Sequence, residues 1–311
     1  MLSPASGHEK TPETPETPET TKTPETMIRP FSIHDPAFLA RATESHGSGT
    51  LSWAARVVAN GGAAPSETTL NALDVFWDAL VAAGIDSKMK VVNIYAPDSL
   101  IACSTPYLVG TGSDPWTNIG PFTSSELTVD GLKGNGTSMA WNTGVLLETE
   151  FPAPSNSHGY TLYTFDALNQ DKRDGGATDS GGVEQLHHLA LSSTLLNYST
   201  PSGTNVVSIA NNLFAGYVCM MRVSSTDLEV YRANSGTAHA LLGSYSGAKV
   251  GTLPAVRPFY VHGSNNVGTL AFPCSRRLSF MALHTHLTSG QSSDFFDAVQ
   301  QLRTDLGGGY A

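Results

Sequence analysis

The segment Asp227-Leu-Glu-Val-Tyr-Arg-Ala-Asn-Ser-Gly236 decides the fold class of this chain. Leu228 and Val230 alternate with polar residues, which is the pattern of a strand with one buried face. The sequence Asn234-Ser-Gly then supplies residues that tolerate the backbone angles of a tight turn. Together with the run from Thr237 onward, the segment predicts a β-hairpin.

Similar short segments occur on both sides of this hairpin in the sequence, and turns rich in Gly, Asn, Ser and Asp separate them. Ten or so strands at such a spacing are typical of a two-sheet antiparallel sandwich. We therefore predict a mainly β chain. The expected strand segments are 91–95, 100–103, 127–132, 138–151, 158–166, 184–191, 204–210, 213–223, 226–233, 237–245, 257–263 and 268–286.

Helical periodicity is confined to the two ends of the chain. Apolar residues at spacings of three and four predict helices over 35–42, 50–62 and 66–84, and a last helix from 292 to the glycines at 307–309. Trp53, Phe76 and Trp77 lie where such helices need core contacts. We divide the chain into a tail at 1–28, a helical docking module at 29–106 and a sandwich with a C-terminal helix at 107–311.

The first 28 residues form a low-complexity tail. The triplet Thr-Pro-Glu recurs at 11–13, 14–16, 17–19 and 23–25, and apolar residues are nearly absent. Such a tract cannot bury enough surface to offset its ordering entropy, and its prolines favour an extended, polyproline-like conformation. We expect a solvated spacer; the alternative is an attachment arm that orders against a partner.

Composition excludes several function classes. The 311 residues include 17 Lys and Arg against 27 Asp and Glu, so the net charge of −10 argues against a nucleic-acid partner. There is no apolar run long enough to span a bilayer and no signal peptide at the start, so we expect a chain without membrane insertion. Cys103, Cys219 and Cys274 are odd in number and far apart, which predicts reduced, buried thiols.

A family resemblance depends on seven segments taken together: 51–62, 68–84, 90–106, 114–118, 131–137, 142–144 and 276–280. They resemble a group of tailed-bacteriophage virion proteins, described as minor structural, tail-fibre or head-associated proteins, which carry a concanavalin A-like (laminin G-like) domain. The resemblance implies a jelly-roll sandwich on a phage particle assembled in the host cytoplasm. The resemblance does not imply catalysis. The partners that it implies are other virion proteins, further copies of the chain or host-surface polysaccharide. It leaves open a capsid or a tail location.

Candidate glycan-binding residues follow from the chemistry of sugars, which stack on exposed aromatic rings and hydrogen-bond with fixed polar groups. Trp116 and Asn118 lie in a turn-rich segment, where core packing explains a tryptophan less readily than on a helix. Trp141, Asn142 and Tyr160 form a weaker set. The alternative for Trp116 is an anchor that plugs the end of the sandwich.

Two groups of residues suggest metal ligands. Asp171, Asp174 and Asp179 offer hard oxygen ligands for calcium, although they lack the spacing of an EF-hand, and a solvated acidic loop is the alternative. His284 and His286 alternate in an expected strand, so both imidazoles would reach one ion. No third ligand is evident, and hydrogen-bonded histidines without a metal are the alternative. No other cofactor is expected.

Catalytic motifs are weak. Asp179-Ser180-Gly-Gly resembles the nucleophile segment of trypsin-like proteases, but His239 follows it rather than preceding it. Glu148-Thr-Glu150 is the nearest carboxylate pair to the Glu-x-Asp-x-x-Glu run of glucanases. We therefore expect a non-enzymatic protein. The alternatives are a glycan-processing enzyme on a glucanase-like sandwich and a bacterial carbohydrate-binding or adhesion module.

Overall fold

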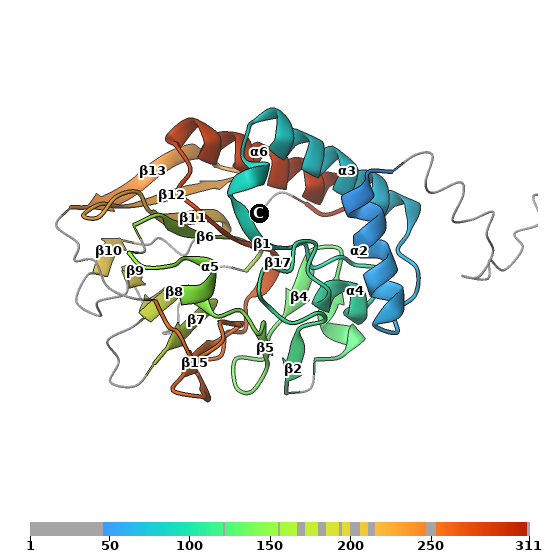
Figure 1. Ribbon diagram of the computed structural model, residues 1–311, viewed down its shortest axis with the longest axis horizontal. Helices are drawn as coiled ribbons and strands as arrows, with labels where there is room; N and C mark the ends of the chain where they lie inside the picture. Colours follow the sequence, from blue (N-terminus) through green and yellow to red (C-terminus); the bar gives the residue numbers. More distant parts are fainter. Residues whose placement is uncertain are drawn as a thin grey trace, which may run out of the picture.

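A computed structural model gives the fold (Figure 1). The predicted tail at 1–28, the predicted helix at 35–42 and Asp171 lie outside the described residues. Only the backbone path is described for the strands between 185 and 210. The structure describes residues 46–120, 122–154, 156–166, 172–179, 185–192, 195–199, 206–210, 215–246 and 253–309.

Two β-sheets form a sandwich, which confirms the predicted fold class. The helix-covered sheet has the order β13-β12-β11-β6-β17-β4-β3, and β1 also pairs with β17. Its strands are β1 (Met89–Asn93), β3 (Leu127–Thr128), β4 (Gly131–Lys133), β6 (His158–Thr164), β11 (Gly216–Arg222), β12 (Leu228–Asn234), β13 (Thr237–Tyr245) and β17 (Arg277–His284).

The outer sheet has the order β10-β9-β8-β7-β14-β5-β2, with β15 and β16 attached to β7. Every pairing is antiparallel except that of β15 with β7. Its strands are β2 (Thr117–Ile119), β5 (Ala140–Asn142), β7 (Gly175–Thr178), β8 (Gln185–Ser192), β9 (Leu195–Ser199), β10 (Val206–Ala210), β14 (Tyr260–Val261), β15 (Ser264–Asn266) and β16 (Thr269–Ala271).

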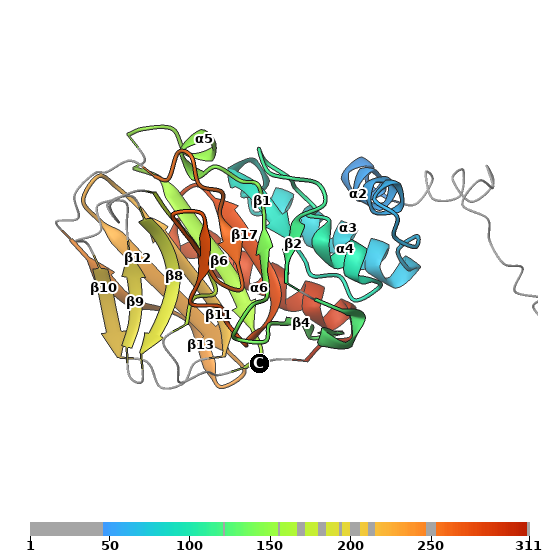
Figure 2. The ribbon, with the colours of Figure 1, turned by 90° about the horizontal axis from the view of Figure 1, so that it is seen from below.

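The helices at 67–82 and 289–305 form a third layer over the first sheet, with the helix at 48–59 beside the former, and Figure 2 shows the same arrangement from below. Ser66 caps α3, and Thr288 caps α6 in a capping box with Gln291, which explains where these two helices begin. The helices are α2 (Ser48–Ala59), α3 (Glu67–Ala82), α4 (Leu100–Ser104), α5 (Leu147–Glu150) and α6 (Ser289–Asp305), with short 3₁₀ turns at Asp86–Lys88 and Ser124–Glu126.

The helix-covered sheet is buried on both faces, so the sequences of its central strands are nearly continuous apolar runs. On β11, Val218 and Met220 enter the core between the sheets, whereas Tyr217, Cys219 and Met221 enter the core under the helices. This alternation lets one strand serve two cores. It explains why a hydrophobic strand such as Gly-Tyr-Val-Cys-Met-Met needs no polar face.

The helical layer is joined to the sheet by aromatic contacts. The ring of Phe280 on β17 lies 5.7 Å from Phe76 of α3 and 5.7 Å from Phe295 of α6, edge to face in both pairs. β1 pairs with β17 as well. Residues on both sides of the expected boundary at 106 and 107 therefore share one sheet and one core.

Most predicted elements are present near their expected positions. The hairpin at 227–236 is confirmed, with Asn234 opposite Thr237 across its turn. The predicted strand at 100–103 is wrong, because Leu100–Ser104 is a helix whose first turn is capped by Ser99 accepting a hydrogen bond from the Ala102 amide at 3.0 Å. The three cysteines are free and buried, as predicted.

Candidate functional site

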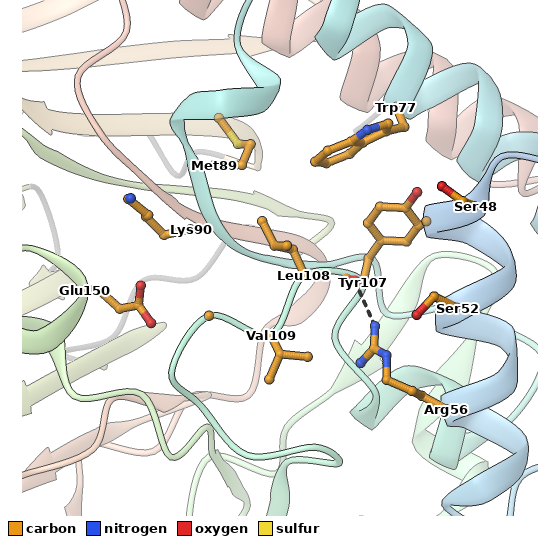
Figure 3. A pocket seen from close by; sticks show the side chains of 12 residues that line it. Ser48, Ser52, Arg56, Trp77, Met89, Lys90, Tyr107, Leu108, Val109 and Glu150 are labelled. Atoms are coloured by element: carbon orange, nitrogen blue, oxygen red, sulfur yellow. Dashed lines mark hydrogen bonds between the residues drawn. The ribbon is translucent and has the colours of Figure 1, made fainter.

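A groove with a volume of about 640 Å³ lies between α2, α3, β1 and α5 (Figure 3). We call it the Lys90 groove. Trp77 and Tyr107 lie toward its helical side, and Lys90 and Glu150 lie at the opposite side. The lining residues are Ser48, Gly49, Ser52, Arg56, Trp77, Met89, Lys90, Tyr107, Leu108, Val109, Gly110 and Glu150.

One face of α2 supplies the polar wall of this groove. Ser48, Ser52 and Arg56 are four residues apart and therefore lie one above another on the helix surface. Trp53 and Val57 on the other face are buried in the helical core. The amphipathic division of α2 thus directs its hydroxyl groups and its guanidinium toward the groove.

An aromatic pair forms the apolar part of the lining. The rings of Trp77 and Tyr107 have centroids 5.3 Å apart and are tilted by 44°. The Tyr107 hydroxyl lies 3.3 Å from Thr50 Oγ1, and Gly49 leaves room for it, because a Cβ at position 49 would lie 2.9 Å from that oxygen. Burial is the main cause of a raised pKa of Tyr107, so the hydroxyl stays protonated at neutral pH.

Arg56 positions the loop that carries Tyr107. Its guanidinium donates to the backbone oxygens of Pro106 at 3.0 Å and Tyr107 at 2.9 Å, and to Asp114 Oδ2 at 2.7 Å. Asn60 donates to the other carboxylate oxygen of Asp114 at 3.0 Å. The planar fork of an arginine suits this triple contact, which ties α2 to the loop. Arg56 is therefore a positioning residue of the groove.

Lys90 and Glu150 supply opposite charges without neutralising each other directly. No ion pair joins them within the described part of the chain, and no described group pairs with the Lys90 ammonium. The Glu150 carboxylate accepts a hydrogen bond from the Thr111 amide, and the residue is 9% exposed. Lys90 is the partly exposed member of the otherwise buried β1.

A second hollow of about 260 Å³ continues beyond these two residues. It shares Lys90 and Glu150 with the groove and is otherwise lined by Phe151, Pro152, Pro154, Asn156, Ser157 and Thr285. The two hollows therefore adjoin at Lys90 and Glu150. Their combined lining has a partly exposed indole, hydroxyls, one ammonium and one carboxylate, a set that suits an elongated polar ligand with apolar faces.

The three aromatic residues proposed for sugar stacking lie inside the sandwich. Trp116 and Trp141 are each 2% exposed and Tyr160 is fully buried, all in the core between the sheets. Trp141 stacks on Phe122 at 5.0 Å, and Trp116 packs edge to face on Tyr95 at 6.4 Å. This corrects the expectation of exposed rings: they are core residues, and Trp116 is the anchor named as its alternative.

The two asparagines of the same set lie near each other without forming a site with those rings. Asn118 is exposed on β2, and its side chain donates to the Phe122 oxygen at 3.5 Å. Asn142 on β5 accepts from the Gly144 amide at 3.0 Å. Thr117 and Asn142 face each other across the β2–β5 pairing. Both amides therefore support local turns, away from the Lys90 groove.

The aspartates proposed for calcium do not converge. Asp174 is buried and forms an ion pair with Arg276 at 2.8 Å, while the Cys274 thiol donates to its other oxygen at 3.1 Å. Burial raises the pKa of Asp174, and the Arg276 charge opposes that shift. Asp179 accepts from the amides of Ala255 and Val256 instead. The expectation that Asp174 and Asp179 bind calcium together is therefore corrected, because each carboxylate has its own partners in the protein.

The histidine pair is also separated. β17 ends at His284, so the strand alternation that would align the two imidazoles does not reach His286. His284 is fully buried, 2.8 Å from Thr161 Oγ1 and edge to face with Phe295, and burial lowers its pKa to about 4. His286 lies half-buried outside the strand. Among the described side chains, no three His, Cys, Asp or Glu are grouped to hold a metal ion.

Sequence reasoning missed the groove because it assigned Trp77 to the core on helical periodicity alone. Trp77 is only partly buried, whereas Phe76 beside it is fully buried. The signal available was the polar row at Ser48, Ser52 and Arg56, which marks a second face of the first described helix. Lys90, inside an apolar strand, was a further signal.

Comparisons with known proteins give structural neighbours only. No family model and no curated protein matches the chain. The carbohydrate-binding module CBM40 of the Ruminococcus gnavus IT-sialidase, bound to α2,3-sialyllactose, matches with 10% identity and a TM-score of 0.36, over 44% of this chain and 80% of that chain. At this identity and TM-score, the match carries no information on ligand or activity.

Two sialidases are among the other matches. NanB of Streptococcus pneumoniae matches with 9% identity and a TM-score of 0.37, over 44% of this chain and 23% of that chain. The Trypanosoma rangeli sialidase matches with 15% identity and a TM-score of 0.37, over 68% and 32%. These matches are to sialidases, and at these TM-scores they do not show that the chain is an enzyme. The expectation of a non-enzymatic protein is nevertheless withdrawn, because it depends on a missing sequence motif, and a missing motif does not exclude catalysis. No helix in the described ranges has the length and apolar character to cross a bilayer.

Proposed function

We propose that this protein binds carbohydrate in the Lys90 groove. The observation that carries the proposal is the pair of adjoining hollows in which the partly exposed Trp77, packed on the buried Tyr107, lies opposite Lys90 and Glu150. A pyranose ring has apolar C–H faces and equatorial hydroxyls, so it needs an aromatic platform and fixed polar partners together. Ser48 and Ser52 add hydroxyl groups on the same wall.

The geometry favours a chain of sugars over a single ring. The groove continues past Lys90 into the second hollow, so Lys90 and Glu150 lie between two neighbouring binding positions. Lys90 donates hydrogen bonds only, and a carboxylate such as Glu150 accepts them only. Sugar hydroxyls do both, so a saccharide that spans the two hollows satisfies both groups.

A glycan array with the full chain, followed by calorimetric titration of the best ligand, tests this proposal. Lys90→Gln should weaken binding about five- to tenfold, equivalent to about 1–1.4 kcal/mol. Lys133→Gln, at a half-exposed lysine outside the groove, is the matched control and should leave affinity unchanged. Binding that is equal in both variants would place the glycan elsewhere. Release of reducing sugar in the same mixture would make the groove an enzyme site.

We further propose that the protein belongs to a phage particle, where the sandwich contacts host polysaccharide or neighbouring virion proteins. This proposal is supported by the sequence resemblance of the segments between 51 and 280. Mass spectrometry and electron microscopy of purified particles from a phage that encodes the chain test it. Density for the sandwich on the particle surface is the expected result, and absence of the chain from the particles is the contrary one.

A further inference from the structure

The Thr-Pro-Glu tail has a strict three-residue register. Its prolines are at 12, 15, 18 and 24, and its glutamates follow at 13, 16, 19 and 25, so every interval is a multiple of three. A polyproline II helix has three residues per turn and rises about 3.1 Å per residue. In that conformation, all four prolines lie in one row and the four glutamates lie in the next.

The Lys90 groove has the chemistry that recognises such a row. Proline-rich ligands in the polyproline II form dock on grooves lined by aromatic rings, because the pyrrolidine rings pack between them. The rings of Trp77 and Tyr107 pack on each other with centroids 5.3 Å apart, and the partly exposed Trp77 indole is the aromatic surface that a proline ring would contact. A polyproline II backbone leaves its carbonyl groups without internal partners, and Ser48 and Ser52 present hydroxyl donors in the same groove.

The charges are complementary as well. The Lys90 ammonium has no partner among the described groups and lies in the same groove, within reach of a row of glutamates. Glu150 is the acidic residue of the lining, and Lys22 takes the glutamate position between Glu19 and Glu25 in the repeat. A tail with both signs in one row matches a groove that holds both signs.

The length of the connecting chain favours the tail of the same molecule. Twenty residues, 26–45, separate the last repeat from His46, and the described chain enters the groove wall directly afterwards at Ser48. Twenty residues span at most about 70 Å when fully extended, so the repeat can reach the groove from His46. A tether of this kind gives an effective concentration in the millimolar range, which is ample for a weak proline-rich contact.

We propose that residues 11–25 occupy the Lys90 groove of their own chain as a polyproline II segment, with a proline on the Trp77 indole and a glutamate on Lys90. The tail then competes with any other ligand of the groove. Competition with carbohydrate rests on the function proposed above, whereas the docking itself does not.

Acrylamide quenching of tryptophan fluorescence tests the docking on the full chain without a glycan. Trp53, Trp116 and Trp141 are buried, so Trp77 is the tryptophan that reports on the groove. Replacing Pro12, Pro15, Pro18 and Pro24 by Ser alters only the tail, and replacing the four repeat threonines by Ser is the matched control. We expect about a twofold rise in the quenching constant for the proline variant and none for the control. Trp77→Phe should abolish that difference.

Three further measurements test the docking: addition of a tail peptide, dilution of the protein and glycan affinity. A peptide of residues 11–25 should restore protection when it is added to the proline variant. Equal quenching in the parent and the proline variant overturns the docking, and protection that falls on dilution overturns its assignment to the same chain. Glycan affinity should rise severalfold in the proline variant. Docking without any glycan binding refutes the proposed function alone, whereas glycan binding with unchanged quenching refutes the docking alone.

Discussion

Two regions of the molecule place tryptophan in opposite roles. At the β2–β5 end of the sandwich, Trp116 and Trp141 are almost completely buried and hold the core between the sheets. On the helical side, Trp77 is partly exposed and lines the Lys90 groove beside Tyr107. The tryptophan in a turn-rich segment is structural, and one on an amphipathic helix is available to ligands. Local sequence context is therefore a poor guide to the exposure of a large ring.

Replacing Trp116 or Trp77 by alanine should give the largest difference between the two regions, measured as the loss in the free energy of unfolding. Trp116→Ala removes a fully packed indole and leaves a cavity between the sheets, so the free energy of unfolding should fall by about 3–5 kcal/mol. Trp77→Ala opens no enclosed cavity and should cost about 1 kcal/mol. Urea denaturation of both variants and the parent measures the difference.

Phe272→Ala is the control for this experiment, because Phe272 is 39% exposed and lies outside the groove. It should change stability by less than about 1 kcal/mol. A cost for Trp77→Ala equal to that of Trp116→Ala would make Trp77 a core residue and remove the contrast between the regions.

The second-largest effect should come from acid, which lowers the free energy of unfolding through two buried histidines. Burial lowers the pKa of His262 to about 3 and of His284 to about 4. As pH falls below about 6.5, the unfolded chain takes up protons that the folded chain does not, so stability is lost. Each histidine should contribute a loss of about 2 kcal/mol between pH 6.5 and 5.

Urea denaturation at pH 7 and pH 5 tests the acid response, with His284→Asn as the variant and His286→Asn as the control outside the strand. The slope of stability with pH should flatten for the first substitution more than for the second. Identical slopes for the parent and His284→Asn would contradict a buried, neutral imidazole.

Arg56→Lys should act on the groove and hardly on the core. A lysine keeps the charge but loses the fork that holds the oxygens of Pro106 and Tyr107 together with Asp114. Ligand affinity should fall about threefold through the displaced Tyr107 loop. Calorimetric titration measures it, and Arg232→Lys on β12 is the matched control. An unchanged affinity would show that the loop holds its position without Arg56.

The smallest effect should come from His46 at the edge of the helical layer. Burial lowers its pKa, but hydrogen bonds to Asp74 at 2.6 Å and Glu67 at 3.0 Å outweigh this and raise it overall. Its stabilisation is therefore full below pH 6.5 and is lost as pH rises through the raised value. His46→Gln should flatten stability between pH 6 and 8, opposite in sign to the interior histidines. A steeper slope in the variant would contradict this.

The sequence predicted the sandwich because strand and turn signals are local. The Asn234 hairpin, the α3 helix ending before Gly84 and the α6 helix before the terminal glycines depend on neighbours a few residues away. The groove was not predictable in this way. It brings together Ser52, Trp77, Lys90, Tyr107 and Glu150, which come from four elements and one loop whose contacts are set only by packing.

The wrong predictions for candidate site residues have the same cause, namely contacts between residues that are far apart in the sequence. The local sequence predicts a loop carboxylate at Asp174, but Arg276, about a hundred residues away, pairs with it inside the sandwich. His284 was read as one of two strand ligands, but the strand ends there and α6 covers it. Trp116 and Trp141 were assigned by the polarity of their neighbours, whereas their environment is set by Tyr95 and Phe122.

Titration of the best array ligand into the parent chain, Trp77→Ala and Phe272→Ala tests the central claim most directly. A groove that binds carbohydrate through the Trp77 ring predicts about a tenfold loss of affinity, or about 1.4 kcal/mol, for Trp77→Ala and none for Phe272→Ala. Equal affinities for the parent and Trp77→Ala, with both chains folded, would contradict the claim.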